Sequence, residues 1–172
     1  MSKIVYFARL NSVNSPGIFN KLVQTVDAFR KNGFKSELVL VEGEGGIRKA
    51  LPSVINILIK LLTLNSDVVI IRNDILIALY FPAIVILRLR GVSVLIDIPT
   101  PINNWIKEID LSKHKSYFWR FKRTLLIRLS FPWSLWPATR IIQYANESAY
   151  FSFGNARKTI LSGNGIDLDH IQ

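Results

Sequence analysis

The sequence predicts an α/β domain with a doubly wound parallel sheet, and three observations support this fold class. Short runs rich in Val, Ile and Leu are apolar on both alternations, which is typical of strands covered on both faces. Longer stretches between them carry apolar residues at three- and four-residue spacing, as amphipathic helices do. The two patterns alternate with short connections, and this alternation implies right-handed crossovers between parallel strands.

The apolar runs predict the strands in chain order. We expect them at Lys3–Ala8, Glu37–Val41, Asp67–Ile71, Val92–Ile96, Arg140–Tyr144 and Thr159–Leu161. The sheet that they form is expected to be Rossmann-like, and residues 1–172 are expected to make one domain.

Three helices are predicted between the first four strands. We expect them at Ile18–Lys31, Ile47–Leu64 and Leu76–Leu89. Asn32 and Gly33 supply a stop for the first helix, and Gly91 supplies one for the third. Strand and helix therefore alternate as far as the fourth strand.

The segment Thr100–Thr139 interrupts this alternation. It contains all four tryptophans, and it has seven Lys or Arg residues against two acidic ones, Glu108 and Asp110. We interpret it as a basic, aromatic, helical insertion before the fifth strand.

The composition limits the classes of function. The net charge is +10, so we expect an anionic partner: nucleic acid, anionic lipid or a phosphorylated ligand. There are no cysteines, which removes disulfides and thiolate metal sites and fits a reducing cytoplasm. The apolar run at the N-terminus is too short for a signal peptide, so we expect no export. The longest uncharged apolar stretch, Ile75–Leu87, has 13 residues, whereas a membrane-spanning helix needs about 20.

The segments after the expected strands contain the candidate binding residues. Ligands of open parallel sheets bind beyond the carboxyl ends of the strands, and polar and small residues gather there in this sequence. The predicted substrate-binding residues are Asn11, Ser15, Gly17, Arg72, Asn73, Asp97, Thr100, Asn146, Glu147 and Asn164.

The segment Asn14–Gly17 opens the first predicted helix and has two interpretations. Its free backbone N–H groups and the positive end of the helix dipole could face an anion. Alternatively, Ser15 is an ordinary N-cap, with Pro16 at the first helical position. The segment lacks the Gly-x-Gly-x-x-Gly fingerprint, so it does not support a tight dinucleotide turn.

Asp97 is the candidate catalytic residue, because it ends an expected strand among apolar residues. It could orient a ligand hydroxyl or act as a base, or it could be a structural carboxylate that caps a neighbouring loop. Neither His114 nor His170 has a carboxylate or cysteine at ligand spacing, so we expect no metal site and no cofactor. The sequence also lacks a nucleophile elbow and a Walker loop, which disfavours a hydrolase triad and a P-loop NTPase.

The segment Lys113–Trp136 mixes aromatic and basic side chains. Four apolar residues fall on one helical stripe: Phe118, Phe121, Leu125 and Leu129. This pattern is typical of a helix at a membrane interface, where aromatic rings favour the headgroup zone and basic groups favour anionic lipid. The alternative is a helix packed on its own domain with a solvated basic face. The predicted membrane-contact residues are Trp119, Arg120, Lys122, Arg123, Trp133 and Trp136.

Nucleic acid is not the partner that we expect for this basic segment. The sequence has neither a zinc finger nor an RNP-like aromatic strand motif. An anionic membrane surface therefore remains the expected partner.

Four segments of the chain carry a resemblance to a known family. The strand Lys3–Ala8 leads through a small-residue loop to a helix that ends at Lys31–Phe34. Asp67–Ile70 is similar to the family's third strand, and Asp97–Pro101 is similar to its strand-end segment. Gly163–Asp167 is similar to the box that closes the family's first domain. Together they resemble the N-terminal domain of GT-B glycosyltransferases, in particular the family-4-like retaining enzymes of bacterial polysaccharide assembly.

The resemblance implies an acceptor-binding domain of a retaining, metal-independent enzyme. A nucleotide-sugar donor would be held by a second, C-terminal domain with a Glu-x7-Glu motif. That motif is absent here, so we expect the donor-binding half to be missing and the chain, truncated or one half of a split enzyme, to be inactive alone. The loop Asn11–Gly17 and the segment Asp97–Pro101 would line the cleft. The family's histidine near that strand end is absent, so no catalytic residue is carried over.

The resemblance also implies a place in the cell. The acceptor would be a glycan or a polyprenyl-linked glycan, and the protein would be cytoplasmic and peripheral on the inner face of the cell membrane. The alternative from another class is a non-catalytic basic Rossmann-like module that binds a membrane surface or a protein partner.

Overall fold

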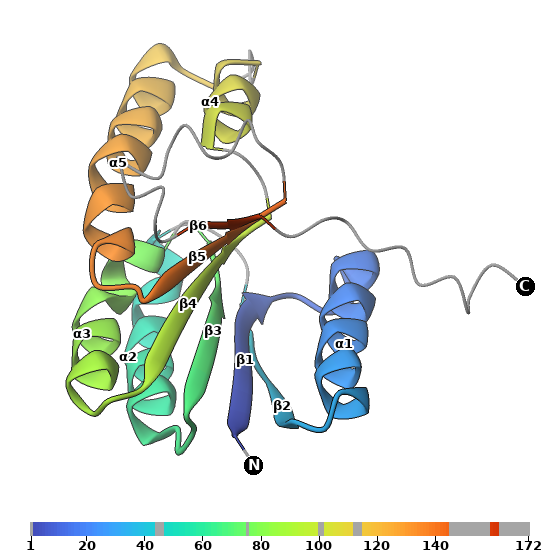
Figure 1. The fold of residues 1–172 in the computed structure, drawn as a ribbon. Coiled ribbons are helices and arrows are strands. Elements are labelled where there is room, and N and C mark those ends of the chain that lie inside the picture. The colour runs from blue at the N-terminus through green and yellow to red at the C-terminus, as the bar shows by residue number, and fades with distance from the viewer. Residues whose placement is uncertain are drawn as a thin grey trace, which may run out of the picture.

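A computed structural model describes residues 2–43, 47–74, 76–99, 102–111, 115–144 and 159–161 of the chain. Six strands form one sheet in the order β2-β1-β3-β4-β5-β6, and every pairing is parallel (Figure 1). The strands are β1 (Lys3–Leu10), β2 (Lys35–Glu42), β3 (Val68–Arg72), β4 (Ser93–Ile98), β5 (Arg140–Gln143) and β6 (Thr159–Leu161). The helices are α1 (Pro16–Lys31), α2 (Ile47–Thr63), α3 (Phe81–Leu89), α4 (Ile102–Leu111), α5 (Tyr117–Leu135) and a 3-10 helix, η1 (Ile77–Tyr80).

The strand order reverses once, between β1 and β3. After β1 the chain adds β2 on one side, and after β2 it crosses back to add β3 and the later strands on the other side. Because crossovers are right-handed, the two directions place helices on opposite faces of the sheet. α1 covers one face, where Leu22 and Val26 cluster with Tyr6 and Ala8, and α2, α3 and α5 lie over the other (Figure 1). The predicted doubly wound α/β fold is confirmed.

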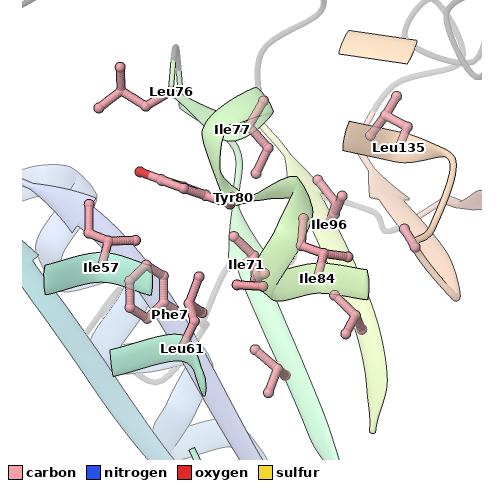
Figure 2. Close-up of a cluster of buried hydrophobic side chains, with 14 of the residues drawn as sticks. Phe7, Ile57, Leu61, Ile71, Leu76, Ile77, Tyr80, Ile84, Ile96 and Leu135 are labelled. Carbon is pink, nitrogen blue, oxygen red and sulfur yellow. The ribbon is translucent and has the colours of Figure 1, made fainter. Parts of the chain in front are cut away.

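The larger part of the core lies between the sheet and the helices α2 and α3. Phe7 and Ile71 of the sheet cluster there with Ile57 and Leu61 of α2 (Figure 2). Phe7 also meets the ring of Tyr80 edge-on, with 6.4 Å between the ring centroids. Both alternations of the central strands are buried, which explains why the sequence of β1 is apolar without a period of two.

The helix ends follow the predicted stop signals. Gly33 follows the last turn of α1 with φ of 83°, and Gly91 follows α3 with φ of 81°. Side chains with a Cβ rarely adopt this left-handed conformation, so glycine lets each helix stop and turn into the next strand.

The single helix predicted at Leu76–Leu89 is wrong, because the structure divides this segment into η1 and α3. Pro82 lies in the first turn of α3. Proline has no backbone N–H and cannot continue a helix from the preceding turn, whereas it fits the first turn of a new one. The periodicity alone did not reveal this break.

Four strands extend beyond their predicted carboxyl ends, β2 and β3 by one residue and β1 and β4 by two. β1 continues to Leu10 and β4 continues to Ile98, so each strand contains a charged residue near its end. In β4 this residue is Asp97, which pairs with Arg72 of β3 and with Ile142 of β5. Asp97 therefore lies within the sheet rather than in a loop.

The predicted insertion before the fifth strand contains α4 and α5. Ile127 and Leu135 of α5 and Ile109 of α4 join the core on the α2 and α3 side of the sheet. Among the described residues, no helix has the length and apolar character needed to cross a membrane.

Two leucines of α3 provide a matched test of this packing. Leu87 has no exposed surface, whereas Leu89 is 82% exposed. We predict that Leu87→Ala lowers the free energy of unfolding by about 2–5 kcal/mol, because it leaves a cavity in the core. Leu89→Ala should change it by less than about 0.5 kcal/mol. Urea denaturation followed by circular dichroism measures both values, and equal losses would contradict the packing.

Candidate functional site

The carboxyl ends of all six strands meet at one edge of the sheet, because every pairing is parallel. In open sheets of this kind ligands bind outside that edge, at the point where the strand order reverses. Here the reversal lies between β1 and β3. The predicted residues Arg72, Asn73 and Asp97 all lie at this edge, on β3 and β4 or directly after β3.

On the α1 face of the sheet, Asp97 is the centre of a buried polar cluster. The Tyr6 hydroxyl donates a hydrogen bond to Asp97 Oδ2, and Arg72 Nη1 lies 3.6 Å from the same oxygen. Tyr144 lies near the same carboxyl group, whose negative charge acts on its hydroxyl. Burial, and then the negative charge of Asp97, raises the pKa of both tyrosine hydroxyls, so both stay protonated donors. The ammonium group of Lys21 lies 4.6 Å from the centre of the Tyr144 ring.

On the opposite face, Asp74 is the centre of a second cluster. Arg9 Nη1 lies 3.5 Å from Asp74 Oδ2, and the Tyr80 hydroxyl donates to the same oxygen at 2.9 Å. The backbone N–H of Leu76 donates to Asp74 Oδ1 at 2.7 Å. Burial raises the pKa of the Asp74 carboxyl, and these three donors act against that shift. Gly43 leaves room for Arg9, because a Cβ at that position would lie 2.8 Å from Arg9 Nε.

The two clusters differ in one respect that bears on function. Both oxygens of Asp74 have partners, so this carboxylate is fully used in holding Arg9 and the start of η1. Asp97 Oδ1 is buried and has no hydrogen-bond partner among the described residues. Asp97 therefore has a free acceptor, whereas Asp74 has a structural role.

Three polar side chains are buried among the described residues: Asn73, Asp97 and Gln143. They end or follow three adjacent strands, β3, β4 and β5, at the carboxyl edge. Each has at least one buried polar atom without a partner in the described part of the chain, namely Asn73 Oδ1 and Nδ2, Asp97 Oδ1 and Gln143 Oε1. Buried polar atoms are nearly always hydrogen-bonded in folded proteins, so a group of exceptions at one edge indicates a place for a ligand.

These side chains reach the edge from both faces of the sheet. Successive residues of a strand point to opposite faces, so Asn73 and Gln143 share the face of α5, on either side of Ile98. Asp97 points to the face of α1, where Tyr6 holds it. The backbone connects the two faces, since the N–H of Asn73 donates to the carbonyl of Asp97 at 2.8 Å.

Asn11 has a structural role in the loop between β1 and α1. Its Oδ1 accepts hydrogen bonds from the backbone N–H groups of Val13 and Asn14, which shapes the turn before α1. Ser15 is the N-cap residue of α1, as expected, but its side chain makes no capping hydrogen bond. Gly17 is exposed in the first turn, with open space around it. Thr100, Asn146, Glu147 and Asn164 lie outside the described residues.

The sequence-based candidates missed several residues of the site, chiefly Tyr6, Arg9, Asp74, Gln143 and Tyr144. Tyr6 lies in the middle of a strand, and its apolar neighbours hide it. Gln143 carries the one usable signal, because it is a polar amide that directly follows the apolar residues Ile141 and Ile142 at a strand end. The partners of Asp97 and Asp74 lie far away in the chain, so spacing alone does not pair them.

The structure separates the predicted membrane-contact residues into those that contact other parts of the protein and those that are exposed to solvent. Trp119 is partly buried against the core, and Arg123 lies over its ring at 5.0 Å. Arg120 Nη1 donates to the carbonyl of Asp110 at the end of α4. Lys122 and Trp136 are exposed. The side chain of Trp133 lies outside the described part of the chain.

A groove of about 670 Å³ lies away from the carboxyl edge. It is lined by residues of α3 and by Trp136, Pro137, Ala138, Thr139 and Arg140, so it borders the amino end of β5. The described residues contain no group of three or more His, Cys, Asp or Glu side chains that could hold a metal ion.

Comparison with known proteins does not assign a family. No protein-family model matches the chain, and no curated protein is detectably similar to it in sequence.

A double-mutant cycle tests the Asp97 cluster. We predict that Tyr6→Phe and Asp97→Asn are coupled by about 1–3 kcal/mol in the free energy of unfolding, because the first removes the donor of a buried hydrogen bond and the second replaces its charged acceptor by a neutral amide. Tyr80→Phe removes the equivalent bond to Asp74 and shares no partner with Asp97, so it should be additive with Asp97→Asn within about 0.5 kcal/mol. Additivity of the first pair would show that this hydrogen bond is not formed.

The pH dependence of stability tests the Asp74 cluster. A carboxyl whose pKa is raised on folding stabilises the protein fully below its unfolded pKa, and this stabilisation is lost as the pH rises through the folded pKa. Asp74→Asn removes the titration. We therefore predict that the stability of the parent relative to this variant falls as the pH rises above the ordinary pKa of an aspartate. Denaturant titrations at several pH values measure the difference, and an increase over this range would oppose the assignment.

Proposed function

We propose that this chain is the acceptor-binding half of a glycosyltransferase. Such an enzyme moves a sugar from a nucleotide-sugar donor to a glycan or a lipid-linked glycan. The observation that carries the proposal is the group of unpartnered polar atoms of Asn73, Asp97 and Gln143 at the carboxyl edge of a parallel sheet.

The chemistry of these atoms favours a sugar over a phosphate. Three of the four are acceptor oxygens, and the fourth is the amide nitrogen of Asn73, which donates. Sugar hydroxyls both donate and accept hydrogen bonds, so they match this set. Phosphate oxygens mainly accept, so they would leave the three acceptors unsatisfied and would repel Asp97. This edge is therefore better suited to the hydroxyl-rich acceptor than to the phosphates of the donor.

Each residue of the edge then has a role in the proposed reaction. The amides of Asn73 and Gln143 orient the acceptor sugar, and Asp97 accepts a hydrogen bond from one of its hydroxyls. Arg72 balances the charge of Asp97 from within the sheet. A second domain would hold the nucleotide sugar across the cleft, and closure would align the two substrates and exclude water. We place this reaction on the cytoplasmic side of the cell membrane, with the protein bound peripherally.

A specific observation favours a second candidate, a non-catalytic basic module that binds a membrane surface or a protein partner. Apolar side chains of α5 are exposed on a chain with a net charge of +10. This candidate needs no sugar-binding edge, so glycan binding separates the two.

Saturation-transfer NMR of the full chain with a water-soluble prenyl-diphosphate-linked disaccharide tests the proposal. We predict that the sugar protons receive saturation from the protein. Asn73→Ala should weaken the binding at least about tenfold, because it removes two hydrogen-bonding atoms that face the ligand. The stability of this variant should remain within about 1 kcal/mol of the parent, since these atoms have no partners in the described structure.

A matched amide pair provides the control. Gln143→Ala should also weaken binding, whereas Gln24→Ala, an exposed position on α1, should not. Absence of saturation transfer, or equal losses for the two glutamines, would overturn the acceptor site. If the chain does not bind the glycan, the second candidate function, a non-catalytic basic module, is favoured.

A further inference from the structure

The outer face of α5 is apolar and exposed. Phe118, Phe121 and Leu125 are 73%, 55% and 43% exposed. Their spacing of three and four residues places them on one stripe along the helix, which we call the α5 stripe. Tyr117, at the start of the helix, is exposed as well. A contiguous patch of this kind usually marks an interaction site.

The inner face of α5 is fixed to the rest of the protein. Trp119 and Ile127 pack toward the core, and Arg123 and Lys115 lie over the Trp119 ring at 5.0 and 5.9 Å. Arg120 donates to the backbone of α4. These contacts fix the rotation of α5, so the α5 stripe cannot turn inward, and its side chains have no part in the core.

The charges around the α5 stripe identify what covers it. At about 100° per residue, Lys122 and Arg128 lie on opposite sides of the stripe, and both are exposed. Between Asp110 and Glu147 the chain has seven Lys or Arg residues and no acidic residue. The surface that covers the stripe must therefore be apolar in its interior and anionic at its boundary.

We propose that α5 lies in the plane of an anionic lipid bilayer, with the α5 stripe inserted among the headgroups and acyl chains. Lys122 and Arg128 extend their alkyl stems along the apolar zone and place their charges at the lipid phosphates. A protein partner fits less well, because the charges beside the stripe are all positive and the stripe is the outer side of a helix rather than a groove. The inference goes beyond sugar transfer and does not depend on it.

Co-sedimentation of the full chain with vesicles tests this inference. The parent should bind vesicles of phosphatidylcholine mixed with phosphatidylglycerol far better than phosphatidylcholine alone, and added salt should weaken the binding. Phe118→Ser with Phe121→Ser should lower the partition coefficient at least about tenfold on the mixed vesicles, because apolar surface no longer enters the bilayer. Lys122→Gln with Arg128→Gln should lower the partition coefficient about thirtyfold on the mixed vesicles. The same pair should not change the partition coefficient on phosphatidylcholine alone.

Exposed apolar residues on another helix provide the matched control. Ile55 and Ile59 of α2 are 62% and 56% exposed, so Ile55→Ser with Ile59→Ser removes a similar area from a different face. This variant should bind vesicles like the parent. All variants should keep the parent's thermal unfolding curve, since none of the substituted side chains is buried.

Three outcomes would overturn the inference. They are a parent that does not bind anionic vesicles, α5 variants that bind like the parent, and an α2 control that loses as much binding as the α5 pair. A parent that self-associates through the α5 stripe, with the Phe variant monomeric by sedimentation velocity and unchanged on vesicles, would assign the stripe to a second copy instead. Glycan binding should be the same in all these variants, so a failure here is distinguishable from a failure of the proposed function.

Discussion

The parallel alignment of all six strands decides where this protein can bind a ligand. Within the sheet, the backbone groups of the four inner strands are satisfied by their neighbours, and helices cover both faces with apolar side chains. Polar side chains can remain available only where the strands end. Because the strands all end at the same edge, Asn73, Asp97 and Gln143 lie along that edge although they are far apart in the chain, the two amides on one face of the sheet and Asp97 on the other.

Two carboxylates lie near this edge, one on each face, Asp97 buried and Asp74 half-buried, and the protein holds them in similar ways. Tyr6 and Arg72 contact Asp97, while Tyr80 and Arg9 contact Asp74. Burying a charge is costly unless hydrogen bonds and an opposite charge compensate it. Asp74 is compensated at both oxygens, whereas Asp97 retains an unpartnered oxygen. A buried carboxylate oxygen without a hydrogen-bond partner lowers the stability of the protein. It is expected at a binding site, where a ligand supplies the missing hydrogen bond.

The alternation of strands and helices could be predicted from the sequence, because it depends on local periodicity. The pairs that build the site could not, because the partners are distant: 91 residues separate Tyr6 from Asp97, and 65 separate Arg9 from Asp74. The same limit applies to α5. Periodicity placed Phe118 on a stripe, but only the contacts of Trp119 with the core show which side of the helix faces outward.

Amide chemical-shift mapping with the prenyl-linked disaccharide tests the central claim most directly, since it locates the ligand without changing a residue. If the carboxyl edge is the acceptor site, the largest shifts fall on the amides of Asn73, Asp97 and Gln143, at the ends of three adjacent strands. Shifts confined to Ser93 and Arg140, at the amino ends of β4 and β5, would place the ligand at the opposite edge and contradict the account.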